Sequence, residues 1–259
     1  MLELKKIHIK QILITVVFFT TSIIYSQNET LFQRGNDLYN QGKYEDAIEI
    51  YQKVIDSDKH SSELYFNLGN AHYKLNNIAS SIYNYEKALI LSPSDKEVEN
   101  NLAFARNMTI DAIDNSPEVG FSKLFKSVVN KFSFDQWAKL SVGFVIGFVL
   151  FFLLYYFAYN TTKKRIAFIA STLCLFLVLV SLALAFKKSE LVKNDTSAIV
   201  FATESIVKSD PNSTSSDLFR LHEGTKIKVL ESFDDWDKIK LSDGETGWIS
   251  SEDIKRIEF

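Results

Sequence analysis

Residues that commonly carry out chemistry are sparse in this sequence and lack the spacing that a reactive site needs. The histidines His8, His60, His72 and His222 are scattered, and the single cysteine, Cys174, lies within an apolar run. One cysteine allows neither a disulfide framework within the chain nor a cysteine metal site. The sequence shows no glycine-rich phosphate loop, no GxSxG or HExxH motif and no pairing of a nucleophile with a base. We therefore predict that the protein is not an enzyme and has no catalytic residues, no metal site and no cofactor.

The charge balance excludes one common class of partner. The chain of 259 residues has a formal net charge of −3, without the basic excess that nucleic-acid binding requires. Its length suffices for two small domains with connecting material. The apolar residues gather in three uninterrupted runs, so we expect a membrane protein without a nucleic-acid partner.

The first apolar run lies near the N-terminus. Lys5, Lys6 and Lys10 precede or flank the uncharged stretch from Ile12 to Ile24. A basic start, an apolar run of this length and a small residue at its end are typical of a secretory signal peptide. We predict that residues 1–26 are a signal peptide cut after Ser26, or alternatively an uncleaved N-terminal anchor.

The other two apolar runs predict a transmembrane hairpin. Leu140 to Ala158 and Ile166 to Phe186 contain no charged residue, and each is long enough to cross a hydrocarbon core of about 30 Å as a helix. Aromatic residues such as Trp137 and Tyr159 lie near the ends of the first of these runs, where interfacial aromatics are common. We predict transmembrane helices over residues 137–159 and 166–186.

The basic residues around the hairpin indicate its orientation. The loop 160–165 contains Lys163, Lys164 and Arg165, which favours a cytoplasmic position, whereas Lys187 and Lys188 argue weakly for the reverse. An N-terminal signal sequence sends the residues after it out of the cytoplasm. We therefore expect both soluble parts on the periplasmic side of a bacterial inner membrane.

Residues 121–136, just before the hairpin, predict an amphipathic helix. Its apolar residues follow helical spacing and its lysines take other positions. Two interpretations stay open: the helix lies on the membrane surface, or it packs as a cap on the preceding helices.

A repeat of 34 residues organises the first soluble part. Gly35 matches Gly69 at this shift, and Tyr51 matches Tyr85. Small residues at fixed points let paired helices approach closely, while tyrosines fill the space between neighbours. Residues 28–115 thus resemble the tetratricopeptide repeat family, with a third first-helix as a terminal cap.

The resemblance implies a concave groove that is lined by residues of the first helix of each repeat. Carried over by repeat position, the groove residues are Phe32, Asn36, Tyr39, Asn40, Phe66, Asn70, Tyr73, Lys74 and Asn100. Some members of the family clamp a C-terminal carboxylate with two asparagines and several basic residues. Asn36 and Asn70 match those asparagines, but Phe32 and Phe66 fall near positions where basic residues would help. Three alternatives stay open for these side chains: a carboxylate clamp, a general peptide groove and a purely structural role in holding the array together.

Short β-rich runs occupy residues 197–259. They alternate with turns, and Asp243-Gly244 is a hairpin signal between two of them. The stretch from Leu221 to Ile249 resembles a bacterial SH3-type domain. In that resemblance Trp236 lies near the binding surface and Trp248 begins the closing segment, and each is either a core residue or a ligand contact. Ser250 stands where a groove proline is expected, so proline-rich recognition is not predicted.

The predicted fold is multi-domain: an all-α tetratricopeptide repeat array, a two-helix transmembrane hairpin and an all-β SH3-like barrel. This order resembles BatE-like proteins of the Bacteroidetes aerotolerance (Bat) group over nearly the whole chain. The resemblance implies von Willebrand A-type membrane proteins as partners and a link to oxidative-stress tolerance. We predict a membrane-anchored interaction scaffold of the envelope, in contact with lipid and other envelope proteins. The alternative is attachment to peptidoglycan through the SH3-like domain.

Overall fold

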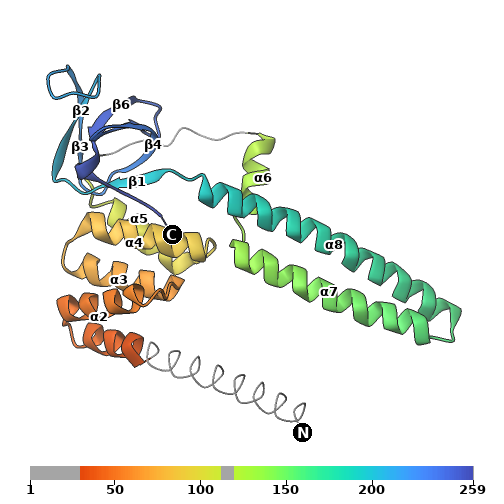
Figure 1. Ribbon diagram of the computed structural model, residues 1–259. Helices are drawn as coiled ribbons and strands as arrows, with labels where there is room; N and C mark the ends of the chain where they lie inside the picture. The colour runs from red at the N-terminus through yellow and green to blue at the C-terminus, as the bar shows by residue number, and fades with distance from the viewer. Residues whose placement is uncertain (1–29, 112–119, 259) are drawn as a thin grey trace, which may run out of the picture.

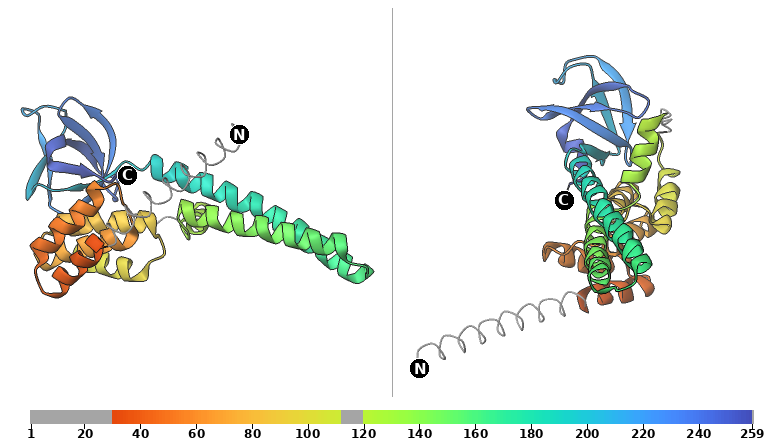
Figure 2. Two further views of the ribbon diagram at one scale, coloured as in Figure 1. Left: turned by 60° about the horizontal axis from the view of Figure 1, so that its bottom comes forward. Right: turned by 90° about the vertical axis from the view of Figure 1, so that its right-hand side faces the viewer.

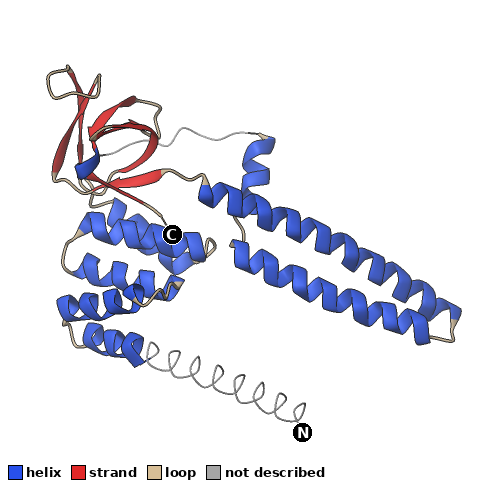
Figure 3. Ribbon diagram, in the orientation of Figure 1, coloured by secondary structure: helices blue, strands red, loops and turns tan. Residues whose placement is uncertain are grey.

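The computed structural model describes residues 30–111 and 120–258, which form a helical array, a long helical hairpin and a sheet-rich domain (Figure 1; Figure 3). The predicted signal peptide, residues 1–26, lies outside the described residues. The hairpin projects away from the other two parts, which lie together at its base (Figure 2). The three parts follow one another in the order that the sequence predicts.

Antiparallel helices build the array. Residues 30–40 are helical, followed by α2 (Tyr44–Asp56), α3 (Ser62–Lys74), α4 (Ile78–Leu91) and α5 (Lys96–Arg106). The 34-residue shift brings equivalent turns to Gly42 and Asn76, which both adopt positive φ angles, 77° and 60°. Asparagine tolerates this left-handed conformation better than most residues that carry a side chain.

Side-chain caps and packing set where these helices begin. The Ser61 hydroxyl accepts a hydrogen bond from the backbone N–H of Leu64, and the Asp95 carboxylate accepts two from the first turn of α5. Such caps satisfy N–H groups that have no partner within a helix. Two buried apolar clusters, one under each repeat, then hold the helices together.

The hairpin consists of α7 (Phe134–Phe157) and α8 (Thr161–Lys193), which lie side by side (Figure 1). Both helices are long and apolar enough to cross a membrane, with mean hydropathy of 2.3 and 2.6 in their most apolar windows. Helix α7 begins before the predicted span 137–159 and ends two residues short of it, whereas α8 extends beyond the predicted span 166–186 at both ends. Polar capping explains the starts: Ser133 and Gln136 form a capping box at α7, and Asn160 caps α8.

The segment before the hairpin differs from the single predicted helix over 121–136. Helix α6 (Phe121–Val129) ends early, and the capping box at Ser133 starts α7 within the predicted range. The Trp137 indole N–H donates to the Val129 carbonyl over 3.2 Å and closes the turn between them. Val129 is fully buried there, and α6 lies against the C-terminal part of α8.

A seven-stranded antiparallel sheet forms the last domain, in the order β3-β2-β6-β5-β4-β1-β7. Alternate residues point into its core, which includes Val207, Ile239 and Ile249. Gly244, in the turn between β5 and β6, has a φ of 106°, as the Asp-Gly signal predicts. The strands are β1 (Ser197–Val200), β2 (Glu204–Lys208), β3 (Asp217–His222), β4 (Lys226–Phe233), β5 (Trp236–Lys240), β6 (Thr246–Ser250) and β7 (Ile254–Arg256).

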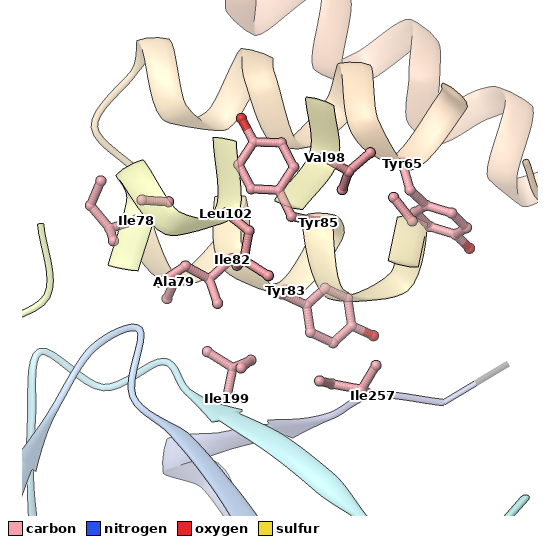
Figure 4. Packing of buried hydrophobic residues seen from close by; sticks show 12 residues of the cluster. Tyr65, Ile78, Ala79, Ile82, Tyr83, Tyr85, Val98, Leu102, Ile199 and Ile257 are labelled. Atoms are coloured by element: carbon pink, nitrogen blue, oxygen red, sulfur yellow. The ribbon is translucent and has the colours of Figure 1, made fainter. Parts of the chain in front are cut away.

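The sheet domain packs directly on the helical array. Ile199 from β1 and Ile257 belong to the same buried cluster as Ile82 and Tyr83 of α4 (Figure 4). Gly224 lies close to α4, because a Cβ atom built there would be 3.1 Å from Ile82 Cδ1. The two domains therefore share a core, and both lie at the same end of the hairpin.

Polar contacts surround this apolar interface. The carboxylate of Asp111, after α5, accepts hydrogen bonds from the His222 backbone N–H (2.7 Å) and the Thr225 hydroxyl (2.6 Å). Glu86 of α4 is buried and pairs with Arg106 in the array and with Lys226 in the sheet domain. The Glu86 carboxylate thus forms one ion pair within the array and one with the sheet domain.

Candidate functional site

A cavity of about 600 Å³ opens on the side of the array that the first helix of each repeat lines. Seven of the nine residues that the family resemblance assigns to a groove line it: Asn36, Tyr39, Asn40, Phe66, Asn70, Tyr73 and Lys74. The size is within the range of common ligand sites. The residues predicted from repeat positions 34 apart thus converge on one concavity.

Asn36 and Asn70 have the same hydrogen-bonding environment, one repeat apart. The Asn36 Oδ1 atom accepts from the Tyr51 hydroxyl (2.8 Å) and from Asn67 Nδ2 (2.9 Å). The corresponding oxygen of Asn70 accepts from Tyr85 (2.6 Å) and Asn101 (2.9 Å). Both oxygens are occupied, so the NH₂ group is the part of each carboxamide that can bind a ligand, and it donates hydrogen bonds.

Close packing fixes the tyrosines that hold these asparagines. A Cβ atom at Gly35 would lie 2.4 Å from the Tyr51 ring, and one at Gly69 would lie 2.7 Å from the Tyr85 ring. Burial raises the pKa of Tyr85 to about 12, so its hydroxyl stays protonated and remains a donor at neutral pH. The glycines are therefore part of the site, since larger residues would displace the rings.

Two of the predicted groove residues lie outside the lining of this cavity. Phe32 packs its ring against Tyr51, with centroids 6.0 Å apart, and Asn100 is exposed. Asn101, one position later, lines the cavity and bonds to Asn70. The 34-residue shift from Asn67 to Asn101 is the sequence signal for this residue, because both side chains donate to a groove asparagine.

The charges that line the groove are few and of both signs. Lys74 and Glu97 line it together with the uncharged side chains. Phe66 also lines it, at a position near which a carboxylate-binding member would carry a basic residue. The groove thus offers amide donors and aromatic surface rather than a concentrated positive charge, which suits the backbone and apolar side chains of a peptide.

A second candidate surface lies on the outer face of the sheet domain. Phe233 stands opposite Trp236, and Lys238 stands opposite Trp248, so all four side chains share one face. The Lys238 ammonium lies 5.6 Å from the centroid of the Trp248 ring. Both tryptophans are half-buried and outside the core cluster, while Phe233 is 56% exposed. Such an aromatic face can stack on an apolar or sugar ligand.

Side chains that could bind a metal ion do not cluster in the described ranges. Within residues 30–111 and 120–258, no group of three or more histidine, cysteine, aspartate or glutamate side chains is arranged to hold a metal ion. Cys174 is half-buried in the apolar part of α8.

Comparison with known families identifies both soluble domains. A model described as "TPR repeat" matches residues 35–76, and one described as "Tetratricopeptide repeat" matches residues 62–95. A model described as "Bacterial SH3 domain" matches residues 204–255. The chain thus contains tetratricopeptide repeats followed by a bacterial SH3 domain, two kinds of domain that support a protein-interaction or cell-wall-binding role.

Similar curated proteins match only the repeats. Tetratricopeptide repeat protein 16 of Mus musculus is 34% identical over 58 residues, which are 22% of this chain and 8% of that protein. RNA polymerase II-associated protein 3 of Rattus norvegicus is 36% identical over 64 residues, 25% of this chain and 10% of that protein. The chain thus spans a tenth or less of the length of these relatives.

A solved structure also matches, at low similarity. It is the Yersinia enterocolitica type III secretion chaperone SycD in complex with a peptide of the translocator YopD. The match has 18% identity, covers 62% of this chain and 93% of that chain, and has a TM-score of 0.29.

Proposed function

We propose that this protein is a membrane-anchored, non-catalytic scaffold of the bacterial envelope, and that its repeat groove binds an extended segment of another envelope protein. The observation that carries the proposal is the paired environment of Asn36 and Asn70. Two carboxamides with occupied oxygens present NH₂ donors one repeat apart. Carbonyl groups along an extended peptide are acceptors at regular intervals, so two such donors can bind one segment.

The hairpin supports anchoring with both soluble domains on one side of the membrane. Two spans return the chain to the side from which it entered, and the buried contacts of Ile199 and Ile257 with α4 need both domains on the same side. The basic loop 160–165 favours the cytoplasm at the far end of the hairpin. The periplasmic side of the inner membrane is therefore the proposed location of the groove.

The domain order extends the proposal to a particular setting. Repeats, hairpin and SH3-like domain follow one another as in BatE-like proteins of the Bacteroidetes aerotolerance group. We include in the proposal von Willebrand A-type membrane proteins as groove partners and a contribution to oxidative-stress tolerance.

Photocrosslinking in the cell membrane tests the groove. A photoreactive residue replaces Lys74, which lines the cavity, and in a control it replaces Asp46, an exposed residue of α2. We expect a discrete membrane-protein adduct from position 74 alone, and its loss when Asn36→Ala and Asn70→Ala are combined. Equal adducts from both positions, or an adduct that the double change leaves intact, would contradict the proposal.

The aromatic face of the sheet domain supports a second candidate function, attachment to peptidoglycan. Trp236 and Trp248 lie outward beside Phe233 and give a surface on which sugar rings can stack. The full-length protein in detergent is sedimented with purified sacculi, with and without Trp236→Ala and Trp248→Ala. If the domain attaches to peptidoglycan, the wild-type protein sediments with the sacculi and the two substitutions abolish this sedimentation. A wild-type protein that stays in the supernatant excludes this function.

A further inference from the structure

A basic cavity of about 800 Å³ lies where the helical array, the base of the hairpin and the sheet domain meet. Three elements supply its five lysines: Lys123 and Lys126 from α6, Lys188 from α8, and Lys226 and Lys228 from β4. The carboxylates in its lining are Glu86 and Asp195. The lining therefore has an excess of three positive charges, although the whole chain has a negative net charge.

The two carboxylates of the cavity already have partners. Glu86 pairs with Lys226 at 2.8 Å and also with Arg106. Asp195 accepts hydrogen bonds from the backbone N–H and the hydroxyl of Ser197. Among the described residues, no carboxylate lies within ion-pair distance of Lys123 or Lys228, so these ammonium groups are available to an external anion.

Lys188 is a buried residue of the cavity lining, and its side chain is held in place by a hydrogen bond. Only 8% of this residue is exposed, and its ammonium donates to the Asn130 Oδ1 atom over 2.9 Å. That contact joins the end of α6 to α8. A lysine has three donors, so one partner leaves further hydrogen bonds for an anion.

The position of the cavity along the hairpin indicates the source of the anion. The uncharged run of α8 ends at Phe186, two residues before Lys188. On α6, which lies against α8, the apolar side chains Leu124, Phe125 and Val128 are exposed, Leu124 to 63%. Basic residues beside exposed apolar residues at the end of a membrane span are placed at the depth of lipid headgroups.

We propose that this cavity binds the phosphate headgroup of an anionic phospholipid, with Lys123, Lys188 and Lys228 as its ligands and the exposed apolar residues of α6 against the acyl chains. The proposal rests on the membrane anchoring argued above. Because residues of the array, the hairpin base and the sheet domain all line the cavity, a bound headgroup ties the array and the sheet domain to the bilayer. The occupant would orient the groove relative to the membrane surface.

Native mass spectrometry of the full-length protein in detergent tests the site. The protein is titrated with phosphatidylglycerol and, separately, with phosphatidylcholine, which has no net charge. We expect saturable binding of phosphatidylglycerol, weakened about 25-fold by combined Lys123→Gln and Lys228→Gln, since each basic residue near an anionic lipid surface strengthens binding about fivefold.

A matched control changes Lys163→Gln and Lys164→Gln, which also removes two positive charges, at the opposite end of the hairpin. This variant is expected to bind phosphatidylglycerol within about twofold of the wild-type affinity. A lysine that contacts the bound lipid would contribute about fivefold, and these two lysines are not part of the cavity. Equal binding of the two lipids, or equal weakening in both double variants, would overturn the proposal. Complete competition by inorganic phosphate would assign the cavity to a free anion and overturn the lipid assignment. Alkaline carbonate extraction of membranes tests anchoring separately, because a protein that stays in the pellet but lacks lipid selectivity refutes this site alone.

Discussion

Replacing Asp111 by alanine is expected to loosen the contact between the helical array and the SH3 domain. The Asp111 carboxylate accepts three hydrogen bonds across this contact: from the His222 backbone, from the His222 ring and from the Thr225 hydroxyl, at 2.6–2.7 Å. Asp111 and these partners are at least 111 residues apart in the sequence. Alanine removes the acceptor and leaves donors at the buried edge of the interface without a partner.

The expected cost is about 2 to 4 kcal/mol. A hydrogen bond to a charged group contributes about 1.5 to 3 kcal/mol, and losses within one cluster are not additive. The Thr225 hydroxyl can rotate to another acceptor, whereas the His222 backbone N–H cannot. With a cost of this size, the contact between the domains should open about 30- to 700-fold more often than in the wild-type protein.

Amide hydrogen exchange of the full-length protein measures this opening, because the His222 N–H is itself protected by Asp111. Peptides that cover residues 218–226 should exchange faster in Asp111→Ala by the factor above. Asp37→Ala, which removes an exposed carboxylate in the first helical segment, serves as the control. If exchange of the His222 amide is the same in both variants, Asp111 does not hold the domains together.

Acidification should weaken the same contact. Burial alone would raise the pKa of Asp111, but hydrogen bonds from Thr225 and His222 outweigh it and lower the pKa below 3.8. A carboxylate with a depressed pKa in the folded state stabilises that state fully above its unfolded pKa. The protection of His222 should therefore be complete above pH of about 5 and decline as the pH falls through and below about 3.8.

Three further outcomes are expected from thermal or urea unfolding of the full-length protein. Gly224→Ala should destabilise the protein more than Gly244→Ala, by about 1 to 3 kcal/mol. Both glycines have a positive φ, but only a Cβ at Gly224 would lie 2.7 Å from another side chain, that of Thr109. Equal losses of stability in the two variants would contradict this prediction. Burial, assisted by the charge of Lys255, lowers the pKa of His72 to about 4, so stability should fall as the pH decreases from about 6.5 to about 4. His72→Leu should make that decline smaller, and an unchanged slope would show that His72 is not its source. Tyr85→Phe removes the donor to Asn70 and should cost about 1 kcal/mol, with no loss indicating that the carboxamide is held by other groups.

Periodic features of the sequence were enough to predict each part of the fold. The 34-residue shift relates Gly35 to Gly69 and Tyr51 to Tyr85, and those pairs pack as predicted from their sizes. Uncharged runs specify apolar helices, since length and composition alone decide whether a helix can cross a membrane. Alternating short runs and an Asp-Gly turn predicted the sheet, because both signals are local.

The groove was largely predictable for the same reason. Helical periodicity decides which residues of a repeat share a face, and seven predicted residues line one cavity. Asn100 was predicted in place of Asn101 because the pattern of lining residues was extended into the cap. There, Asn101 follows instead the anchoring position of Asn67, so that its side chain binds Asn70.

Only the tertiary structure decided how the parts meet. No local pattern relates Asp111 to His222, Ile257 to Tyr83, or Lys123 to Lys228, because each pair depends on how whole domains dock. The sequence by itself therefore determined a set of repeats, a hairpin and an SH3 domain, through spacing within each segment. Their shared core and the basic cavity at their junction arise from contacts between residues distant in sequence. Periodicity within a segment does not predict such contacts.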